Sequence, residues 1–207
     1  MALRTIYTLE NPVLRAKAKK ITRFDDHLER LAEDMFDTMR AAPGVGLAAP
    51  QIGLSIRVLV AEYEEESVAL VNPEIIKASA DEELGTEGCL SIPGVVGDDV
   101  PRATAVTVKA KDLKGKEIRL KADGWFARIL QHEIDHLDGV LFIDRIAPEK
   151  VRPLRPDEIA DEAEVHHEPA GEMMAGASVP TKSANSSAKA REKRASLPAS
   201  ERSGGRG

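Results

Sequence analysis

The uneven distribution of aromatic residues limits where this 207-residue chain can build a folded core. All seven aromatic side chains precede residue 147, and none follows it. Residues 148–207 are rich in Ala, Ser, Gly, Pro and charged side chains, and such a segment buries too little apolar surface to offset its ordering entropy. We therefore expect one domain over residues 1–147. The charged, low-complexity tail at 148–207 should be mostly disordered, with room for a helix at its start.

Charge, cysteine content and hydropathy exclude several classes of protein. The net charge of −6 gives no overall basic field, which argues against a general nucleic-acid binder and against a specific DNA partner. The single cysteine, Cys89, excludes an internal disulfide and fits a reducing cytosol. No apolar run approaches the roughly 20 residues that span a bilayer, and the N-terminus lacks the apolar core of a secretory signal. These features predict a cytoplasmic protein without a membrane partner.

The hydrophobic pattern predicts an α+β domain with two helices. One helix is expected from about Asp25 to Met39, where apolar residues recur at helical spacing. The other is expected from about Gly124 to Leu137, closed by Gly139. Short runs typical of β-strands separate the two helices and are punctuated by Pro and Gly: Ile56–Ala61, Val68–Val71, Ala105–Lys109 and Glu117–Leu120.

The strongest local signal is the run His132-Glu133-Ile134-Asp135-His136. On a helix, residues four apart lie on one face, so both imidazoles can bind one metal ion. Glu133 is then placed to reach a water molecule on that metal. Two unrelated histidines would give this five-residue pattern by chance in roughly one such chain in a hundred. The pattern therefore favours a catalytic metal site.

A catalytic metal held by two histidines needs a third protein ligand. Many zinc proteases supply it as the last histidine of HExxHxxGxxH, but that position here is Phe142, which cannot bind a metal. Glu158 is one downstream candidate, which would fit a zinc endopeptidase. Cys89, in the segment Glu87–Ser91, is the better candidate, because a thiolate with two imidazoles suits iron(II), zinc, cobalt or nickel.

A third segment, residues 44–53, is rich in glycine but is not a phosphate-binding loop, since it lacks the Gly-Lys-Ser/Thr ending. By itself it predicts a buried turn followed by a strand. Its informative polar residue is Gln51, whose side-chain amide can donate to a developing oxyanion.

Three segments together resemble the signature motifs of the peptide deformylase family: GVGLAAPQIG at 44–53, EGCLS at 87–91 and QHEIDHLDG at 131–139. Their order and approximate spacing are also those of the family, and the similarity runs from about Asn11 to Asp144. It begins so early that an organelle transit peptide does not fit. The resemblance implies small mixed or antiparallel sheets packed around a central metal-binding helix, with Cys89, His132 and His136 as the metal ligands.

The resemblance also implies an activity, the hydrolytic removal of the N-formyl group from the formylmethionine of nascent proteins, with release of formate. A metal-bound hydroxide would attack the formyl carbon, and Glu133 would act as general acid and base. Gln51 and the Leu90 backbone N–H would stabilise the oxyanion with the metal. The family favours iron(II) in cells, with zinc, nickel or cobalt as substitutes.

For the substrate, the resemblance implies that Gly46 and neighbouring backbone bind the extended peptide. Val45, Trp125 and Ile129 are our candidates for the wall of the methionine pocket. The expected partners are formyl-methionyl nascent peptides and, transiently, the ribosome, and we expect a monomer.

Two departures from the family pattern stand out. Val96 lies near a position where many relatives place an arginine that contacts the substrate, so no residue is assigned that role. Arg102 is a candidate to pair with Glu87 in support of the site. The second departure is the long tail, whose basic end could touch ribosomal RNA, although an inert tail is favoured. A non-catalytic, ribosome-associated metal protein is the remaining alternative, but it would have no need of Glu133.

Overall fold

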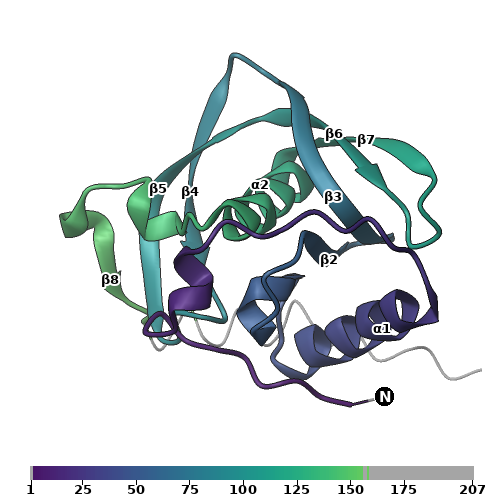
Figure 1. The fold of residues 1–207 in the computed structure, drawn as a ribbon. Coiled ribbons are helices and arrows are strands. Elements are labelled where there is room, and N and C mark those ends of the chain that lie inside the picture. The colour runs from purple at the N-terminus through teal and green to yellow at the C-terminus, as the bar shows by residue number, and fades with distance from the viewer. Residues whose placement is uncertain (1, 156–157, 159–207) are drawn as a thin grey trace, which may run out of the picture. The chain divides into compact units, whose positions relative to one another are not determined.

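Two antiparallel sheets and two α-helices form the part of the chain that this computed structural model describes, residues 2–155 and 158 (Figure 1). The larger sheet has the strand order β1-β2-β3-β6-β7 and the smaller has the order β4-β5-β8. The strands of the larger sheet are β1 (Gly46–Ala48), β2 (Val58–Tyr63), β3 (Glu66–Ala78), β6 (Ala105–Lys111) and β7 (Glu117–Asp123). Those of the smaller sheet are β4 (Glu82–Gly88), β5 (Val95–Ala103) and β8 (Val151–Pro153).

Helix α1 (Asp26–Ala41) and helix α2 (Gly124–Asp138) confirm the two predicted helices within two residues at each end. The side chain of Asp25 accepts hydrogen bonds from two backbone N–H groups in the first turn of α1, as an N-cap does. Helix α2 ends at Gly139, which adopts a left-handed conformation with φ of 76°. A side chain there would collide with the backbone of Arg15, so glycine is needed for both reasons.

Helix α2 lies between the two sheets and contacts strands of both (Figure 1). Its apolar side chains join those of β2, β3 and β6 in the main hydrophobic core, which includes Leu59, Leu70, Val108, Leu130 and Leu137. Helix α1 packs through a second core on β1 and β2, which also includes Val71 of β3. Helix α2, which carries the histidine pair, is therefore held by its contacts with both sheets.

Several elements were not predicted, namely β1, β4, β5 and β8. The predicted β-runs lie within or overlap β2, β3, β6 and β7. Short 3-10 helices fill the connections: η1 (Pro12–Arg15), η2 (Ala49–Ile52), η3 (Phe142–Asp144) and η4 (Pro148–Lys150).

The described chain continues past the expected domain boundary at residue 147. There it forms η4 and then β8, which pairs with Val95–Gly97 of β5. The sequence alone allows for an α-helix at the start of this segment. After β8, only residues 154, 155 and 158 of the expected tail are among the described residues. Among the described helices, none is long and apolar enough to cross a membrane.

Candidate metal centre

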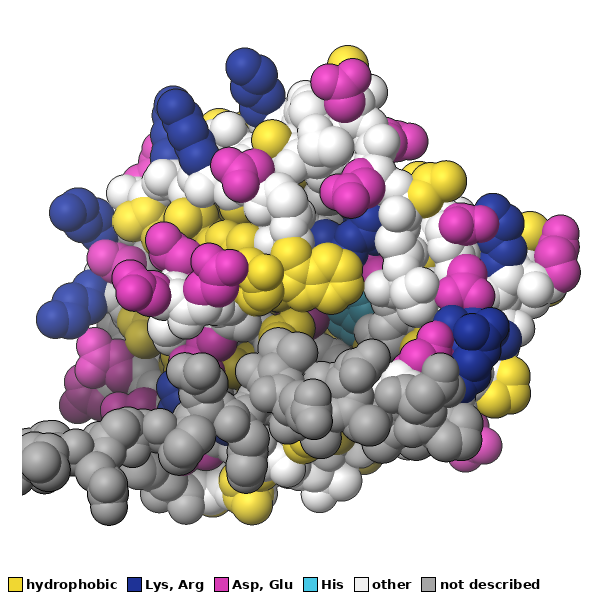
Figure 2. All heavy atoms as spheres, turned by 180° about the vertical axis from the view of Figure 1, so that it is seen from behind, with side chains coloured by type: hydrophobic (Ala, Val, Ile, Leu, Met, Phe, Trp, Pro, Cys, Tyr) yellow, Lys and Arg dark blue, Asp and Glu magenta, His cyan; other side chains and the backbone are white. Residues whose placement is uncertain are grey.

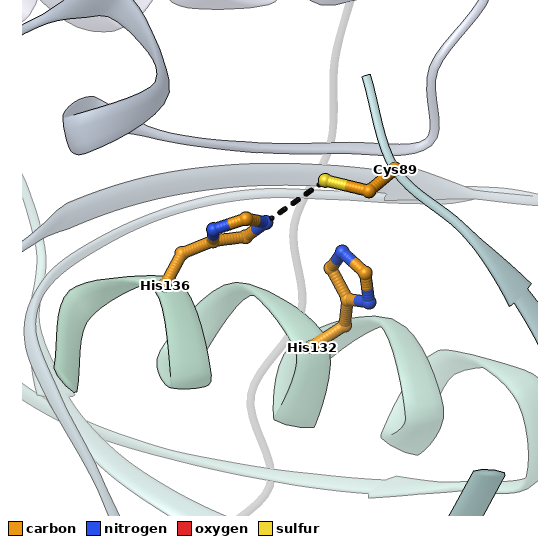
Figure 3. A group of neighbouring side chains, drawn as sticks. All are labelled: Cys89, His132 and His136. Atoms are coloured by element: carbon orange, nitrogen blue, oxygen red, sulfur yellow. Dashed lines mark hydrogen bonds between the residues drawn. The ribbon is translucent and has the colours of Figure 1, made fainter. Parts of the chain in front are cut away.

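Cys89, His132 and His136 converge on one point between β4 and α2 (Figure 3). Each side chain offers one ligand atom, and these three atoms lie within 4.8 Å of one another. The Sγ atom of Cys89 is 3.2 Å from Nε2 of His136. The two histidines stand one helical turn apart, as the spacing in the sequence predicted, with ring centroids 5.0 Å apart.

The donor set fits a transition-metal ion. Tetrahedral coordination with a sulfur at about 2.3 Å and a nitrogen at about 2.0 Å places these two atoms about 3.5 Å apart. The separation between Cys89 and His136 is close to that value. One thiolate and two imidazoles leave a fourth coordination position for a reactant, which is the arrangement of catalytic sites.

Glu87 contacts His132 at the ring nitrogen that faces away from Cys89. The Oε2 atom of Glu87 is 2.9 Å from Nδ1 of His132. Because that contact engages Nδ1, the ring presents Nε2 toward Cys89. Metal-binding histidines almost always use their second nitrogen in this way, which fixes the orientation of the ring.

The protonation of the cluster follows from burial and from the neighbouring charges. Burial by itself would lower the pKa of His132, but hydrogen bonds with Cys89 and Glu87 outweigh it and raise that pKa well above its ordinary value. Burial, reinforced by the charge of His132, lowers the pKa of His136 well below its ordinary value. The two histidines of the pair thus lie in electrostatically different surroundings.

Glu133 lies against β1 with its carboxyl group inside the protein. Burial raises the pKa of Glu133 to about 7. Its Oε2 atom is buried and has no hydrogen-bond partner among the described residues. A β-carbon on Gly46 would come within 2.8 Å of the Glu133 carboxyl carbon, so the glycine leaves room for this side chain. A carboxyl group with a pKa near 7, next to a cluster of candidate metal ligands, has the properties of a general acid and base.

Gln51 is fully buried, and its side-chain amide is held in a fixed orientation. Its Oε1 atom accepts a hydrogen bond of 2.7 Å from the backbone N–H of Ala48. The opposite end of the amide, Nε2, then faces the Cys89 sulfur at 3.7 Å. An N–H donor is thereby directed at the sulfur of the cluster.

Leu90 lies in the turn that follows Cys89. The turn is closed by a hydrogen bond from the N–H of Ile92 to the Cys89 carbonyl, and the N–H of Ser91 is 3.4 Å from the sulfur. An N-terminal arm, which includes Tyr7 and Leu9, forms hydrogen bonds both to this turn and to the Gln51 segment. Tyr7 donates its backbone N–H to the carbonyl of Gln51, and Leu9 donates to that of Ser91.

Only two of the three residues expected to line the methionine pocket belong to one hydrophobic cluster. Val45 and Ile129 belong to the same hydrophobic cluster, and Ile129 is buried. Trp125 lies outside that cluster and is 44% exposed at the start of α2. Figure 2 shows a histidine side chain at the bottom of a recess bordered by hydrophobic side chains.

A chain of opposite charges, which we call the charge ladder and which is buried except at Arg145, supports the cluster: Arg128, Glu87, Arg102, Asp135 and Arg145. The pairing of Arg102 with Glu87 is confirmed, through two hydrogen bonds of 2.8 Å. Burial raises the pKa of Glu87, but hydrogen bonds from Arg102 and His132 outweigh it and hold that pKa far below its ordinary range. The roles of Arg128 and Asp135 were not predicted, since nothing local in the sequence indicates buried partners.

Three other residues considered in the sequence analysis have a clear place in the structure. Phe142 is buried and stacks on the ring of His132, with the centroids 6.2 Å apart. Glu158, the alternative ligand, forms an ion pair of 2.6 Å with Arg152 and is not part of the metal-binding cluster. Val96 is buried within β5 and pairs with Gly88 and Arg152.

The chain matches the family described as polypeptide deformylase over residues 3–152. A peptide deformylase of Thermomicrobium roseum is 51% identical over 173 residues, which cover 79% of this chain and 97% of that protein. One of Natranaerobius thermophilus is 54% identical over 146 residues, covering 70% of this chain and 93% of the relative.

Solved structures agree with the sequence relatives. The crystal structure of peptide deformylase from Thermus thermophilus has a TM-score of 0.68 and 47% identity, covering 72% of this chain and 88% of that one. The structure of peptide deformylase from Thermotoga maritima has a TM-score of 0.69 and 41% identity, covering 72% and 100%. With the cysteine and histidine cluster, the buried glutamate and these matches in view, the chain belongs to the peptide deformylase family.

Proposed function

We propose that this chain uses Cys89, His132 and His136 to hold one divalent metal ion, with which it removes the formyl group from N-terminal formylmethionine. The observation that carries the proposal is the convergence of the three ligand atoms within 4.8 Å, beside the buried carboxyl group of Glu133. A thiolate ligand and two imidazoles suit iron(II) as the resident metal, with zinc, nickel or cobalt as alternatives.

When bound, the ion acts as a Lewis acid that polarises the formyl carbonyl and lowers the pKa of a water molecule in the site. Glu133 accepts the proton of the attacking water, because its pKa near 7 lets it gain and lose a proton easily. It then donates that proton to the amine nitrogen as the C–N bond breaks. The products are formate and a free N-terminal amine.

Gln51 and the turn at Leu90 complete the polar part of the proposed site. The Gln51 amide donates to the oxygen that becomes negatively charged, and its fixed orientation means that little reorganisation is needed. The Leu90 N–H is proposed as a second donor to the same oxygen. The turn at Cys89–Ile92 and the N-terminal arm keep both donors in place.

The proposed methionine pocket uses Val45, Ile129 and the exposed face of Trp125, and Gly46 lines the path of the peptide. Val45 and Ile129 supply apolar contact for an unbranched side chain, and Trp125 is accessible enough to meet a substrate from solvent. We propose that the catalytic unit extends through β8, since this strand pairs with the strand that follows the Cys89 turn.

Formate release tests the proposal. Protein purified without oxygen and loaded with iron(II) should release one formate per formyl-Met-Ala-Ser tripeptide and none from the unformylated peptide. Glu133→Ala should hold one metal ion and lose most turnover. Cleavage of internal peptide bonds in unformylated peptides, without formate release, would instead favour an endopeptidase.

A further inference from the structure

The metal ligands come from two separate elements, and their relative position has to be fixed. Cys89 follows β4 of the smaller sheet, while His132 and His136 lie on α2. A rotation of α2 about its own axis would turn both imidazoles away from the sulfur. Apolar packing holds α2 in place, and hydrogen bonds between charged groups add a geometric requirement on its rotation.

Arg128 lies on α2 one turn before His132, and its guanidinium reaches three residues of the smaller sheet. Its Nη1 atom donates to Oε1 of Glu87 and to the carbonyl of Val100, both at 2.9 Å. Its Nη2 atom donates to the carbonyl of Glu83 at 2.7 Å. The residue is 5% exposed, so these bonds are shielded from water.

Glu87 therefore holds α2 at two successive turns. Its Oε1 atom accepts from Arg128, and its Oε2 atom is in contact with His132. The guanidinium of Arg102 bonds to both oxygens from the other side. Because a carboxylate offers about four acceptor positions, all of them are used, and the group has no freedom to turn.

The main chain of β4 leaves space for the guanidinium of Arg128. A β-carbon on Gly85 of β4 would lie 2.8 Å from the central carbon of the guanidinium. Glycine at that position lets the planar group approach the strand. The central carbon of the guanidinium also lies over the ring of Trp125, 5.8 Å from its centroid.

We propose that Arg128 is a positioning residue of the metal site, which fixes the rotation of α2 against the Cys89 strand through the carboxylate of Glu87. This inference rests on the proposed function, because it assumes that Cys89, His132 and His136 hold the metal. Arg128 itself contacts neither metal nor substrate. It acts by keeping Nε2 of His132 directed at the ion.

Metal release and cobalt spectroscopy test the role separately from activity. Cobalt(II)-loaded protein should show a visible spectrum that reports on the thiolate and the imidazoles. Arg128→Met keeps an unbranched side chain but removes the donors. It should release the metal to a chelator about 10–100-fold faster, as loss of such supporting groups does elsewhere, and should change the spectrum. Arg128→Lys should fall between this variant and the wild type.

Gly85→Ala provides a matched variant that retains every charge. Its methyl group displaces the guanidinium, so it should change the cobalt spectrum and the release rate in the same direction as Arg128→Met, by a smaller factor. Arg119→Met, on the exposed side of β7, is the control and should leave both unchanged. If Arg128→Met does not fold, Gly85→Ala and Arg128→Lys decide the question.

Wild-type release rates and spectra in Arg128→Lys and Gly85→Ala, with only a lower Tm, would overturn the proposal and leave Arg128 a structural residue. Failure of the underlying metal assignment would look different. In that case wild-type protein would bind no stoichiometric cobalt, or Cys89→Ala would bind it as tightly as wild type.

Discussion

The backbone of Gly46 lies against the carboxyl group of Glu133, so closely that a β-carbon on the glycine would come 2.8 Å from the carboxyl carbon. We expect Gly46→Ala to displace Glu133 from its proton-transfer position while leaving the metal ligands in place. A misplacement of about 1 Å can cost about 10²-fold, so kcat on a formyl-Met tripeptide should fall by roughly that factor. Metal content, measured by atomic absorption, should remain one per chain. A fully active Gly46→Ala enzyme would show that Glu133 works from another position.

Replacement of Glu133 itself should have a larger effect. Glu133→Ala removes the proton acceptor, and general acid–base groups contribute about 10²–10⁴-fold. We expect kcat to fall within that range while the cobalt spectrum stays near that of wild type. Glu133→Gln keeps the shape without the basicity and should be similarly impaired. Turnover near the wild-type rate in a metal-replete variant would remove Glu133 from the mechanism.

Cys89 should determine which metal the site prefers. Cys89→Ser replaces a soft thiolate by a rarely ionised hydroxyl, which should weaken iron(II) and zinc binding. Competition with a chelator measures the change, and the neighbouring Ser91→Ala is a useful control because its hydroxyl has no partner among the described residues. Cys89→Ala with the iron(II) or zinc affinity of wild type would contradict the three-ligand assignment.

The ion pairs of Arg152 should make stability depend on pH at the acid end. Hydrogen bonds from Arg152 lower the pKa of Glu158 to about 2 and also lower that of Asp98. A carboxyl group with a depressed pKa in the folded state stabilises the protein above its unfolded pKa, and loses this contribution as pH falls toward the folded pKa. Wild type should therefore have a higher Tm than Arg152→Met near pH 6, and the difference should shrink between pH 4 and pH 2. A difference that stays constant over this range would exclude the ion pairs as its source.

Two truncations test the extent of the catalytic unit. Deletion of residues 170–207 should leave deformylation of short peptides within about twofold and barely change Tm. Deletion of 148–207 also removes β8, which leaves part of β5 without its partner strand and Asp98 without Arg152. This second variant should unfold at a clearly lower temperature. A large loss of activity from the first deletion would place part of the catalytic unit beyond residue 169.

The helices and the histidine pair could be predicted from the sequence because their signals are local, whereas Cys89 was predicted from thiolate chemistry and from the family resemblance. Helix α2 combines a periodic apolar stripe with a C-terminal glycine, and the two histidines lie four apart on it. Strand β4 carries no such signal, since most of its side chains are exposed and it is stabilised by pairing with β5. The role of Arg128 is equally hidden, because its partner Glu87 lies 41 residues away in the sequence. From the sequence alone, an arginine in a helix is expected at the surface, because the strand that buries it is distant in the sequence.

The separation of the ligands along the chain has a consequence for synthesis. Cys89 and His136 lie 47 residues apart. At about 5–20 residues per second, the thiol leaves the translating ribosome some 2–10 seconds before the second histidine. Until then the Cys89 thiol lacks the complete histidine pair with which it converges in the folded protein. Because the proposed metal needs ligands from both segments, we expect the ion to be bound only after His136 has emerged.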